Sequence, residues 1–164
     1  MNIIQAVYSV RKDAVVILEG GGMLMIGDWK EKVSAVLMGY YPGMEGGTAL
    51  GEVLFGKINP SGKLPFSVPE KQEHLPHIDW DAKVQWYEYY SGYMRLDKNG
   101  WEPAFPFGFG MSYTEFEVKN LKGWVEDDRL CASVQVCNIG GYDGAEVIQM
   151  YVGMPDSKVE RPKR

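Results

Sequence analysis

The spacing of apolar residues changes along this chain, and that change limits the folds open to it. Near the start, Ala14–Leu18 is an almost unbroken apolar run that ends close to three consecutive glycines. Such a run is typical of a strand buried on both faces of a parallel sheet. Near the end, apolar residues take every second position from Leu130 to Val136, which indicates a strand with one buried face. The sequence therefore predicts an α/β part followed by an all-β part.

The α/β pattern extends from the start of the chain to Pro69. Apolar residues at helical spacing, namely Ile3, Ile4, Val7 and Tyr8, predict the end of a helix, and a second apolar run at Val33–Met38 continues the alternation of helix and strand. Thr48 is expected to cap a further helix that stops at Gly56. After this helix the sequence predicts, in order, a turn at residues 59–62 and a short strand at residues 63–68.

The middle of the chain, from Glu70 to about Gly110, loses this regular spacing and becomes rich in aromatic residues, proline and glycine. We interpret it as a long, packed linker. Strands are then predicted at residues 115–121, 130–138 and 145–152. An immunoglobulin-like sandwich takes about seven strands, so three strands imply an incomplete one. We expect three regions: part of an α/β domain at residues 1–69, a linker at residues 70–112 and an incomplete β-sandwich at residues 113–164.

Composition excludes several classes of protein. Hydrophobic residues make up 45% of the chain, which is normal for a globular protein. The net charge is −5, so no domain-wide basic surface is available for nucleic acid. No apolar run approaches the roughly 18 to 20 residues that span a bilayer. The start lacks the basic and apolar regions of a signal peptide, so a cytoplasmic location is expected if Met1 is the true start.

The sequence predicts no metal or cofactor. Cys131 and Cys137 lie six residues apart in one predicted strand, about 20 Å from each other, so they cannot form a disulfide. His74 and His77 flank Pro76, which breaks the helix that would align them as metal ligands. The glycine-rich segments at residues 20–22 and 43–47 lack the lysine or the full glycine pattern of nucleotide-binding loops.

No catalytic residue is predicted either. Glycoside hydrolysis needs two carboxylates roughly 5 to 10 Å apart, and their spacing in the sequence does not identify such a pair. Asp79 and Asp81 are interpreted as solvated linker residues, and the adjacent aspartates at residues 127–128 as a hairpin turn. Glu45 is expected to hold the turn before a helix, through backbone N–H groups or the helix dipole. No partner residue can be named for it.

Aromatic residues in the linker leave two interpretations open. Their rings could stack on sugars, or they could pack the linker against neighbouring domains, which we favour. Exposure in an open groove would indicate sugar binding, whereas burial would indicate a scaffold. The residues are Trp80, Trp86, Tyr87, Tyr89, Tyr90, Tyr93 and Trp101. The basic end at residues 161–164 is interpreted as a solvated strand end.

Several separated segments together resemble glycoside hydrolase family 3. The match rests on Val33-Ser34-Ala35-Val36-Leu37, Tyr41-Pro42-Gly43-Met44-Glu45-Gly46-Gly47, Val53-Leu54-Phe55-Gly56, Asn59-Pro60-Ser61-Gly62-Lys63-Leu64-Pro65 and Pro106-Phe107-Gly108-Phe109-Gly110-Met111-Ser112-Tyr113-Thr114. Residues 136–140 and 144–152 are similar to the fibronectin type III-like module of that family. Two departures are Met44, where glutamine is common, and Met111, where leucine is common.

This resemblance implies the end of an α/β/α sandwich followed by the start of a fibronectin type III-like β-sandwich. It also implies a β-glucosidase-like parent that hydrolyses terminal sugars from β-glucosides or related oligosaccharides by a retaining mechanism. In the family the nucleophile lies on an upstream barrel, and the acid/base glutamate usually lies before the stretch matching Ile3–Val10. Neither motif is present, so the chain is expected to be inactive alone.

The alternative is a complete small module that binds carbohydrate without catalysis or has a purely structural role. Two further expectations follow from an incomplete β-sandwich. Uncovered apolar faces should make the chain self-associate. The segment Pro106–Thr114 should be buried, with Phe107→Ala costing about 3 to 5 kcal/mol if the ring is fully covered.

Overall fold

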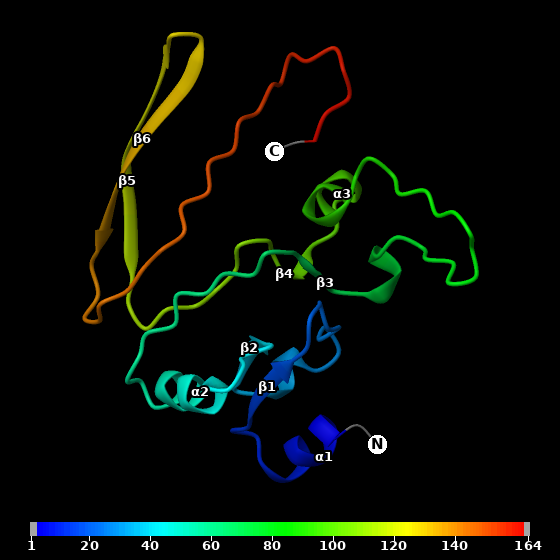
Figure 1. Ribbon diagram of the computed structural model, residues 1–164, viewed down its shortest axis with the longest axis vertical. Coiled ribbons are helices and arrows are strands. Elements are labelled where there is room, and N and C mark those ends of the chain that lie inside the picture. The colour runs from blue at the N-terminus through cyan, green and yellow to red at the C-terminus, as the bar shows by residue number, and fades with distance from the viewer. Residues whose placement is uncertain (1–2, 163–164) are drawn as a thin grey trace. The chain divides into compact units, whose positions relative to one another are not determined.

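The computed structural model describes residues 3–162 and contains both helices and strands (Figure 1). The chain forms two compact units. Unit 1 contains the residues up to Gly47, Leu64–Phe109 and the residues from Gln149 onward, and unit 2 contains Thr48–Lys63 and Gly110–Ile148. Lys163 and Arg164 lie outside the described residues, so the interpretation of the basic end stays a prediction. Within residues 3–162, no helix has the length and apolar character needed to cross a membrane.

The first strands of unit 1 match the prediction closely. Helix α1 spans Ile3–Val10, and β1 (Val15–Glu19) pairs in parallel with β2 (Ala35–Tyr40). The pairing is regular as far as Leu18 and shifts at Glu19, whose partner is Tyr40. A short 3-10 helix, η1 (Lys30–Lys32), lies between the two strands in the sequence. The predicted parallel sheet is therefore confirmed, but exposed and half-buried residues alternate along β1, so the expected burial on both faces is wrong for this chain.

Helix α2 spans Gly46–Leu54, so the predicted cap at Thr48 is wrong. The helix begins two residues earlier because the preceding turn already closes at Gly43, where φ is 71°. The backbone N–H of Gly46 donates to the carbonyl of Gly43 at 3.2 Å. The predicted stop at Gly56 is confirmed by its φ of 72°, a conformation that glycine adopts readily after a helix.

The predicted strand at residues 63–68 is mostly absent. Strand β3 contains only Val68–Pro69 and pairs antiparallel with β4 (Pro103–Phe105). Proline has no N–H to give to a strand ladder, and Pro65 interrupts the predicted strand. Instead, the backbone of Leu64 exchanges two 2.8 Å hydrogen bonds with nearby residues, accepting from Gly108 and donating to Phe109.

The core of unit 1 gathers beside this short ladder. Ile26, Val68 and Ala104 are buried and in contact. Partly buried side chains surround them, namely Leu18, Met23, Trp29, Leu64, Phe66 and Phe105. The core therefore draws on β1, β3 and β4 as well as on the loops next to them.

The stretch interpreted as a linker contains two short helices as well as β4. The 3-10 helix η2 spans Gln72–His74, and α3 spans Gly92–Asn99. Gly100 ends α3 in the left-handed region with φ 66°, and the N–H of Trp101 donates to the carbonyl of Leu96 at 3.0 Å. Leu96 is the buried residue of this helix. Two turns with one buried position give too weak a periodic signal to predict.

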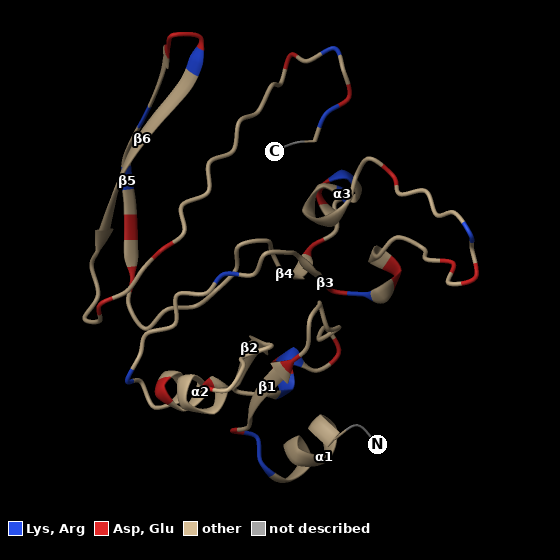
Figure 2. Cartoon of the chain, in the orientation of Figure 1, with Lys and Arg blue, Asp and Glu red and all other residues tan. Residues whose placement is uncertain are grey.

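Unit 2 contains a long antiparallel hairpin of β5 (Phe116–Glu126) and β6 (Arg129–Asn138). Asp127 and Asp128 connect the strands with φ values of 48° and 59°, as in a two-residue type I′ turn. The predicted hairpin turn is thus confirmed, and its acidic tip is visible in Figure 2. The two cysteines are free and lie on the same strand, as expected.

The third predicted strand, at residues 145–152, does not form among the described residues. The segment has alternating apolar residues, but a strand also needs a hydrogen-bonded neighbour. In the structure β5 and β6 pair only with each other within the described part of the chain. The sequence pattern was sufficient to suggest the strand but carries no information on whether a partner strand is present.

The small core of unit 1 allows a direct test. Ile26→Ala removes a side chain that is buried with Val68 and Ala104, and large-to-small changes at such sites cost about 2 to 5 kcal/mol. We expect a clearly lower denaturation temperature by circular dichroism. Ile3→Ala, at an exposed position of α1, is the matched control and should change stability by less than about 0.5 kcal/mol. Equal effects of the two substitutions would contradict the assignment of the core.

Candidate functional site

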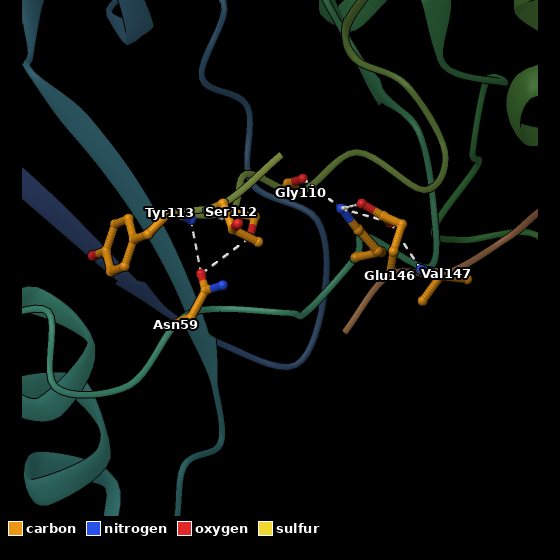
Figure 3. Close-up of polar contacts among 8 residues, drawn as sticks. Asn59, Gly110, Ser112, Tyr113, Glu146 and Val147 are labelled. Carbon is orange, nitrogen blue, oxygen red and sulfur yellow. Dashed lines mark hydrogen bonds and ion pairs between the residues drawn. The ribbon is translucent and has the colours of Figure 1, made fainter. Parts of the chain in front are cut away.

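Asn59 connects three parts of unit 2 that are far apart in the sequence (Figure 3). Its Oδ1 accepts hydrogen bonds from the hydroxyl of Ser112 at 3.1 Å and from the backbone N–H of Tyr113 at 2.7 Å. Its Nδ2 donates to the carbonyl of Asp143 at 3.0 Å. One amide side chain thereby fixes the turn at residues 59–62, the segment after Gly110 and the loop before Gly144.

Lys63 makes a second connection beside the first. Its Nζ donates to the carbonyl of Gly110 at 2.7 Å and forms an ion pair with Glu146 at 2.9 Å. The Lys63 side chain is 12% exposed and that of Glu146 is 21% exposed, so water screens the pair only in part. The Glu146 carboxylate also accepts from the backbone N–H of Val147 at 2.8 Å (Figure 3).

We name Asn59, Lys63, Ser112, Tyr113 and Glu146 the polar clamp. The backbone approaches very closely here, because a Cβ added to Gly110 would lie 2.1 Å from the carbonyl oxygen of Gly62. The hydroxyl of Tyr113 adds a 2.7 Å hydrogen bond to the carbonyl of Val53 in α2. The clamp therefore fastens α2 and the following turn to the start of the hairpin region.

The electrostatics of the clamp suit fastening better than catalysis. The hydrogen bond from Lys63 holds the pKa of Glu146 below its ordinary value of 4.5, although partial burial opposes this effect. The carboxylate therefore stays ionised at neutral pH, whereas a general acid must hold a proton there. Both charged groups are engaged with each other and with the backbone.

The carboxylates considered in the sequence lie elsewhere. Glu45 is exposed and directly precedes the first residue of α2. A backbone hydrogen bond between Gly43 and Gly46 closes the turn, and the expected interaction of Glu45 with the helix dipole stays a prediction. Asp79 Oδ1 accepts from the N–H of Asp81 at 3.0 Å, a local turn among exposed residues.

The two histidines do not come together as a metal site. The His74 ring stacks on Trp101, with ring centroids 4.4 Å apart, and its buried Nδ1 has no hydrogen-bond partner among the described residues. The carbonyl of His77 accepts from Gln85 at 3.1 Å. Across residues 3–162, no three His, Cys, Asp or Glu side chains cluster as metal ligands would.

The linker aromatics divide into two groups. Tyr93 contacts Phe107 and Tyr151, Trp101 stacks on His74, and the Lys98 ammonium lies 4.0 Å from the centre of the Tyr90 ring. The other four are exposed, so the packing interpretation is wrong for them within this chain: Trp80, Trp86, Tyr87 and Tyr89.

A small cavity of unit 1 lies between the packed aromatics, with a volume of about 50 Å³. Its lining includes Tyr93, Leu96, Asp97, Phe107 and Tyr151. Pockets that hold a drug-sized ligand measure about 300 to 1,000 Å³. The cavity is therefore too small to enclose a sugar.

The predicted burial of Pro106–Thr114 is only partly correct. Thr114 is buried, but Phe107 is 38% exposed, and Phe109, Met111 and Tyr113 are also exposed. Phe107 has the Tyr93 ring on one side, at a centroid distance of 5.6 Å. A ring covered in part stabilises less than a fully buried one, so the expected cost of 3 to 5 kcal/mol for Phe107→Ala is too high for this chain.

Comparison with known proteins identifies the family. Residues 1–113 match the family described as the glycosyl hydrolase family 3 C-terminal domain. The chain belongs to this family. Its relatives include thermostable beta-glucosidase B of Acetivibrio thermocellus, 39% identical over 99% of this chain, and a beta-glucosidase of Rhizobium radiobacter, 39% identical over 98% of it. The chain spans 23% and 21% of the length of these two proteins.

Solved structures give the same assignment. The glycoside hydrolase family 3 β-glucosidase of Bifidobacterium adolescentis is similar over 98% of this chain and 25% of its own, with a TM-score of 0.88 and 30% identity. β-Glucosidase 3B of Thermotoga neapolitana, solved in complex with glucose, is similar over 98% of this chain and 24% of its own. The TM-score is 0.87 and the sequence identity is 31%. The mixed helix and sheet content is thus that of the C-terminal domain in this family of glycoside hydrolases.

The polar clamp predicts how stability depends on pH. Because the folded-state pKa of Glu146 is lowered, its ion pair stabilises the fold above the ordinary pKa of the group, and this contribution is lost as pH falls through the folded-state value. Glu146→Gln should lower the free energy of unfolding by about 1 to 3 kcal/mol at neutral pH. The difference from the unsubstituted chain should shrink as the pH falls below 4.5.

Urea unfolding of dilute protein across this pH range would measure both effects. In a chain that already carries Lys63→Met, the further change Glu146→Gln should no longer cause a loss of unfolding free energy that shrinks as the pH falls. Glu117→Gln is the matched control, because Glu117 pairs with Lys119 on the more exposed surface of β5, where a pair contributes about 0 to 1 kcal/mol. A pH-independent difference between the chain and its Glu146→Gln variant would contradict the prediction.

Proposed function

We propose that this chain is the C-terminal part of a longer β-glucosidase that hydrolyses terminal bonds of β-glucosides or related oligosaccharides with retention. One observation carries the proposal. Proteins named as β-glucosidases are 39% identical to this chain over almost all of it, and the chain spans less than a quarter of each. A retaining mechanism requires two carboxylates, and we propose that the longer protein supplies both.

The role of this chain in such an enzyme is structural. Glu146 is held as an ionised partner of Lys63, and Asp79 completes a local turn. The ionised and paired carboxylate of Glu146 has no proton to donate to a leaving group at neutral pH. We therefore assign no catalytic, cofactor-binding or metal-binding residue to the chain. The polar clamp holds its segments in register.

We also propose a domain organisation. Residues 1–69 form the end of an α/β/α sandwich, residues 70–112 a linker, and residues 113–164 the start of a fibronectin type III-like β-sandwich. The parallel pair β1–β2 with its helices supports the first assignment. The end of the family match at residue 113 supports the boundary. The hairpin β5–β6 supports a β-rich region after it.

A segment exchange tests the proposed function. The aligned segment of thermostable beta-glucosidase B of Acetivibrio thermocellus is replaced by this chain, giving a chimera. We expect the chimera to hydrolyse an aryl β-glucoside, because the clamp and the core should rebuild the missing part. The same exchange with the aligned Rhizobium radiobacter segment is the positive control, and deletion of the segment is the negative control.

The isolated chain should not hydrolyse the same substrate above a buffer blank, because positioning without the two reacting carboxylates does not break the bond. Turnover by the purified chain that disappears when one of its own carboxylates is changed would contradict the proposal. A folded chimera without activity, beside an active positive control, would also count against it.

Self-association of the isolated chain follows from the exposed hairpin. A two-stranded hairpin is marginally stable alone, and both outer edges offer unpaired N–H and C=O groups. Apolar side chains of both strands are exposed, namely Val118, Leu121, Val125, Leu130 and Val136. We propose that copies of the chain associate through this hairpin at micromolar concentration, as exposed edges and apolar surface commonly cause.

Light scattering during gel filtration at several concentrations would measure the association. Leu121→Lys with Val125→Lys should shift the chain towards monomer. Ser133→Lys is the matched control, because it adds charge at an exposed polar position of β6 without removing an apolar side chain. A compact monomer that unfolds cooperatively and binds no hydrophobic dye would contradict the prediction.

A further inference from the structure

A loop of unit 1 presents its largest side chains to solvent. It spans residues 77–90, the bright green excursion that precedes α3 in Figure 1, and we name it the aromatic loop. Trp80 and Trp86 are each 88% exposed, and Tyr87 and Tyr89 are 67% and 70% exposed. Each of these rings would bury a large apolar area if covered. Several exposed aromatics in one loop mark an interaction surface more often than a solvated one.

The aromatic loop is held in shape by its own polar side chains. Gln85 bridges it, since its Oε1 accepts from the N–H of Asp79 at 3.1 Å and its Nε2 donates to the carbonyl of His77 at 3.1 Å. At the other end Glu88 pairs with Arg95 of α3 at 3.0 Å. The exposed rings are therefore displayed on a closed loop, and a fixed surface loses less entropy when it binds.

The same hydrogen bonds favour a protein partner over a sugar. A sugar site needs polar groups beside the ring that reach the sugar hydroxyls. Here both polar atoms of the Gln85 amide bond to the loop backbone, and Asp79 Oδ1 accepts from Asp81. Four rings of the loop remain exposed, and Trp and Tyr are the residues that most often anchor protein interfaces.

The longer protein of the proposed function supplies the partner. The chain spans 23% of the relative from Acetivibrio thermocellus, so about three quarters of that protein has no counterpart here. The loop has three acidic residues and one basic residue, Asp79, Asp81, Glu88 and Lys83, which suits an apolar surface with a basic rim. Resting on the proposed function, we propose that the aromatic loop docks on this remaining part of a longer β-glucosidase, with Trp80 and Trp86 as buried anchors.

The accessibility of individual tryptophans tests the proposal. The isolated chain and the chimera described above are treated with limiting N-bromosuccinimide, and oxidation of each tryptophan is measured by peptide mass spectrometry. Trp80 and Trp86 should react at least about tenfold more slowly in the chimera, as expected for anchors removed from solvent. Trp101, whose ring stacks on His74 within unit 1, is the internal control and should react at similar rates in both.

Variants of the loop give an independent readout. In trans, the isolated chain is titrated into the relative that lacks its aligned segment, and binding is followed by calorimetry. Trp86→Ala should weaken binding about 30-fold, the effect of losing a 2 kcal/mol anchor, whereas Trp86→Phe should retain part of the affinity. Lys83→Ala, which changes an exposed residue of the same loop without removing a ring, is the matched control. Because Trp86 is almost fully exposed, these variants should leave the circular dichroism of the isolated chain unchanged.

Two results would overturn the proposal. The first is a folded chimera in which Trp80 and Trp86 are oxidised as fast as in the isolated chain. The second is protection of these tryptophans in the isolated chain by cellobiose or laminarin, which would make the loop a sugar-binding surface instead. A folded but inactive chimera would count against the proposed function alone, because protection from oxidation is measured without turnover.

Discussion

The hydrogen bonds of Asn59 and Lys63 are the interactions on which the arrangement of unit 2 depends. They join residues 59–63 to residues 110–113 and 143–146, which are separated by long stretches of chain. Bringing the ends of such long chain segments together costs conformational entropy, and this cost grows slowly with segment length. The hydrogen bonds of the Asn59 and Lys63 side chains offset it. Hydrogen bonds to charged groups contribute more than neutral ones, so the Lys63–Glu146 pair is suited to this place.

The second constraint is that this chain has too few segments to cover all of its apolar side chains. Unit 1 buries a small cluster around Ile26, Val68 and Ala104, while the aromatic loop and the hairpin leave many apolar side chains in solvent. Both regions nevertheless have defined local structure, because turn geometry and side-chain hydrogen bonds fix them without a core. Asp127 and Asp128 set the hairpin turn, and Gln85 closes the aromatic loop. Local order combined with uncovered apolar faces is what a part of a larger fold would show.

Sequence reasoning succeeded where a local pattern is sufficient. The apolar runs predicted β1 and β2, and paired aspartates between alternating strands predicted the hairpin turn. It failed where structure depends on distant partners or on short elements. Residues 145–152 have a strand pattern but no pairing neighbour among the described residues. Helix α3 has one buried position, and Pro65 confines β3 to two residues. In the polar clamp, Asn59 was placed in a turn, but a sequence gives no sign that its amide would meet Ser112 and Tyr113.

The clamp also explains why two of the motifs that carry the family resemblance contain the residue types they do. Asn59, Lys63, Gly110 and Tyr113 lie in two of the motifs that carry the resemblance, and in the structure these motifs contact each other. Their residue types follow from that contact: an amide that accepts and donates at once, a cation that reaches a carbonyl and a carboxylate, and a glycine where a Cβ would collide with the carbonyl of Gly62. Each requirement concerns assembly, and none involves a reacting group. These two motifs therefore report how segments of this chain are joined to each other.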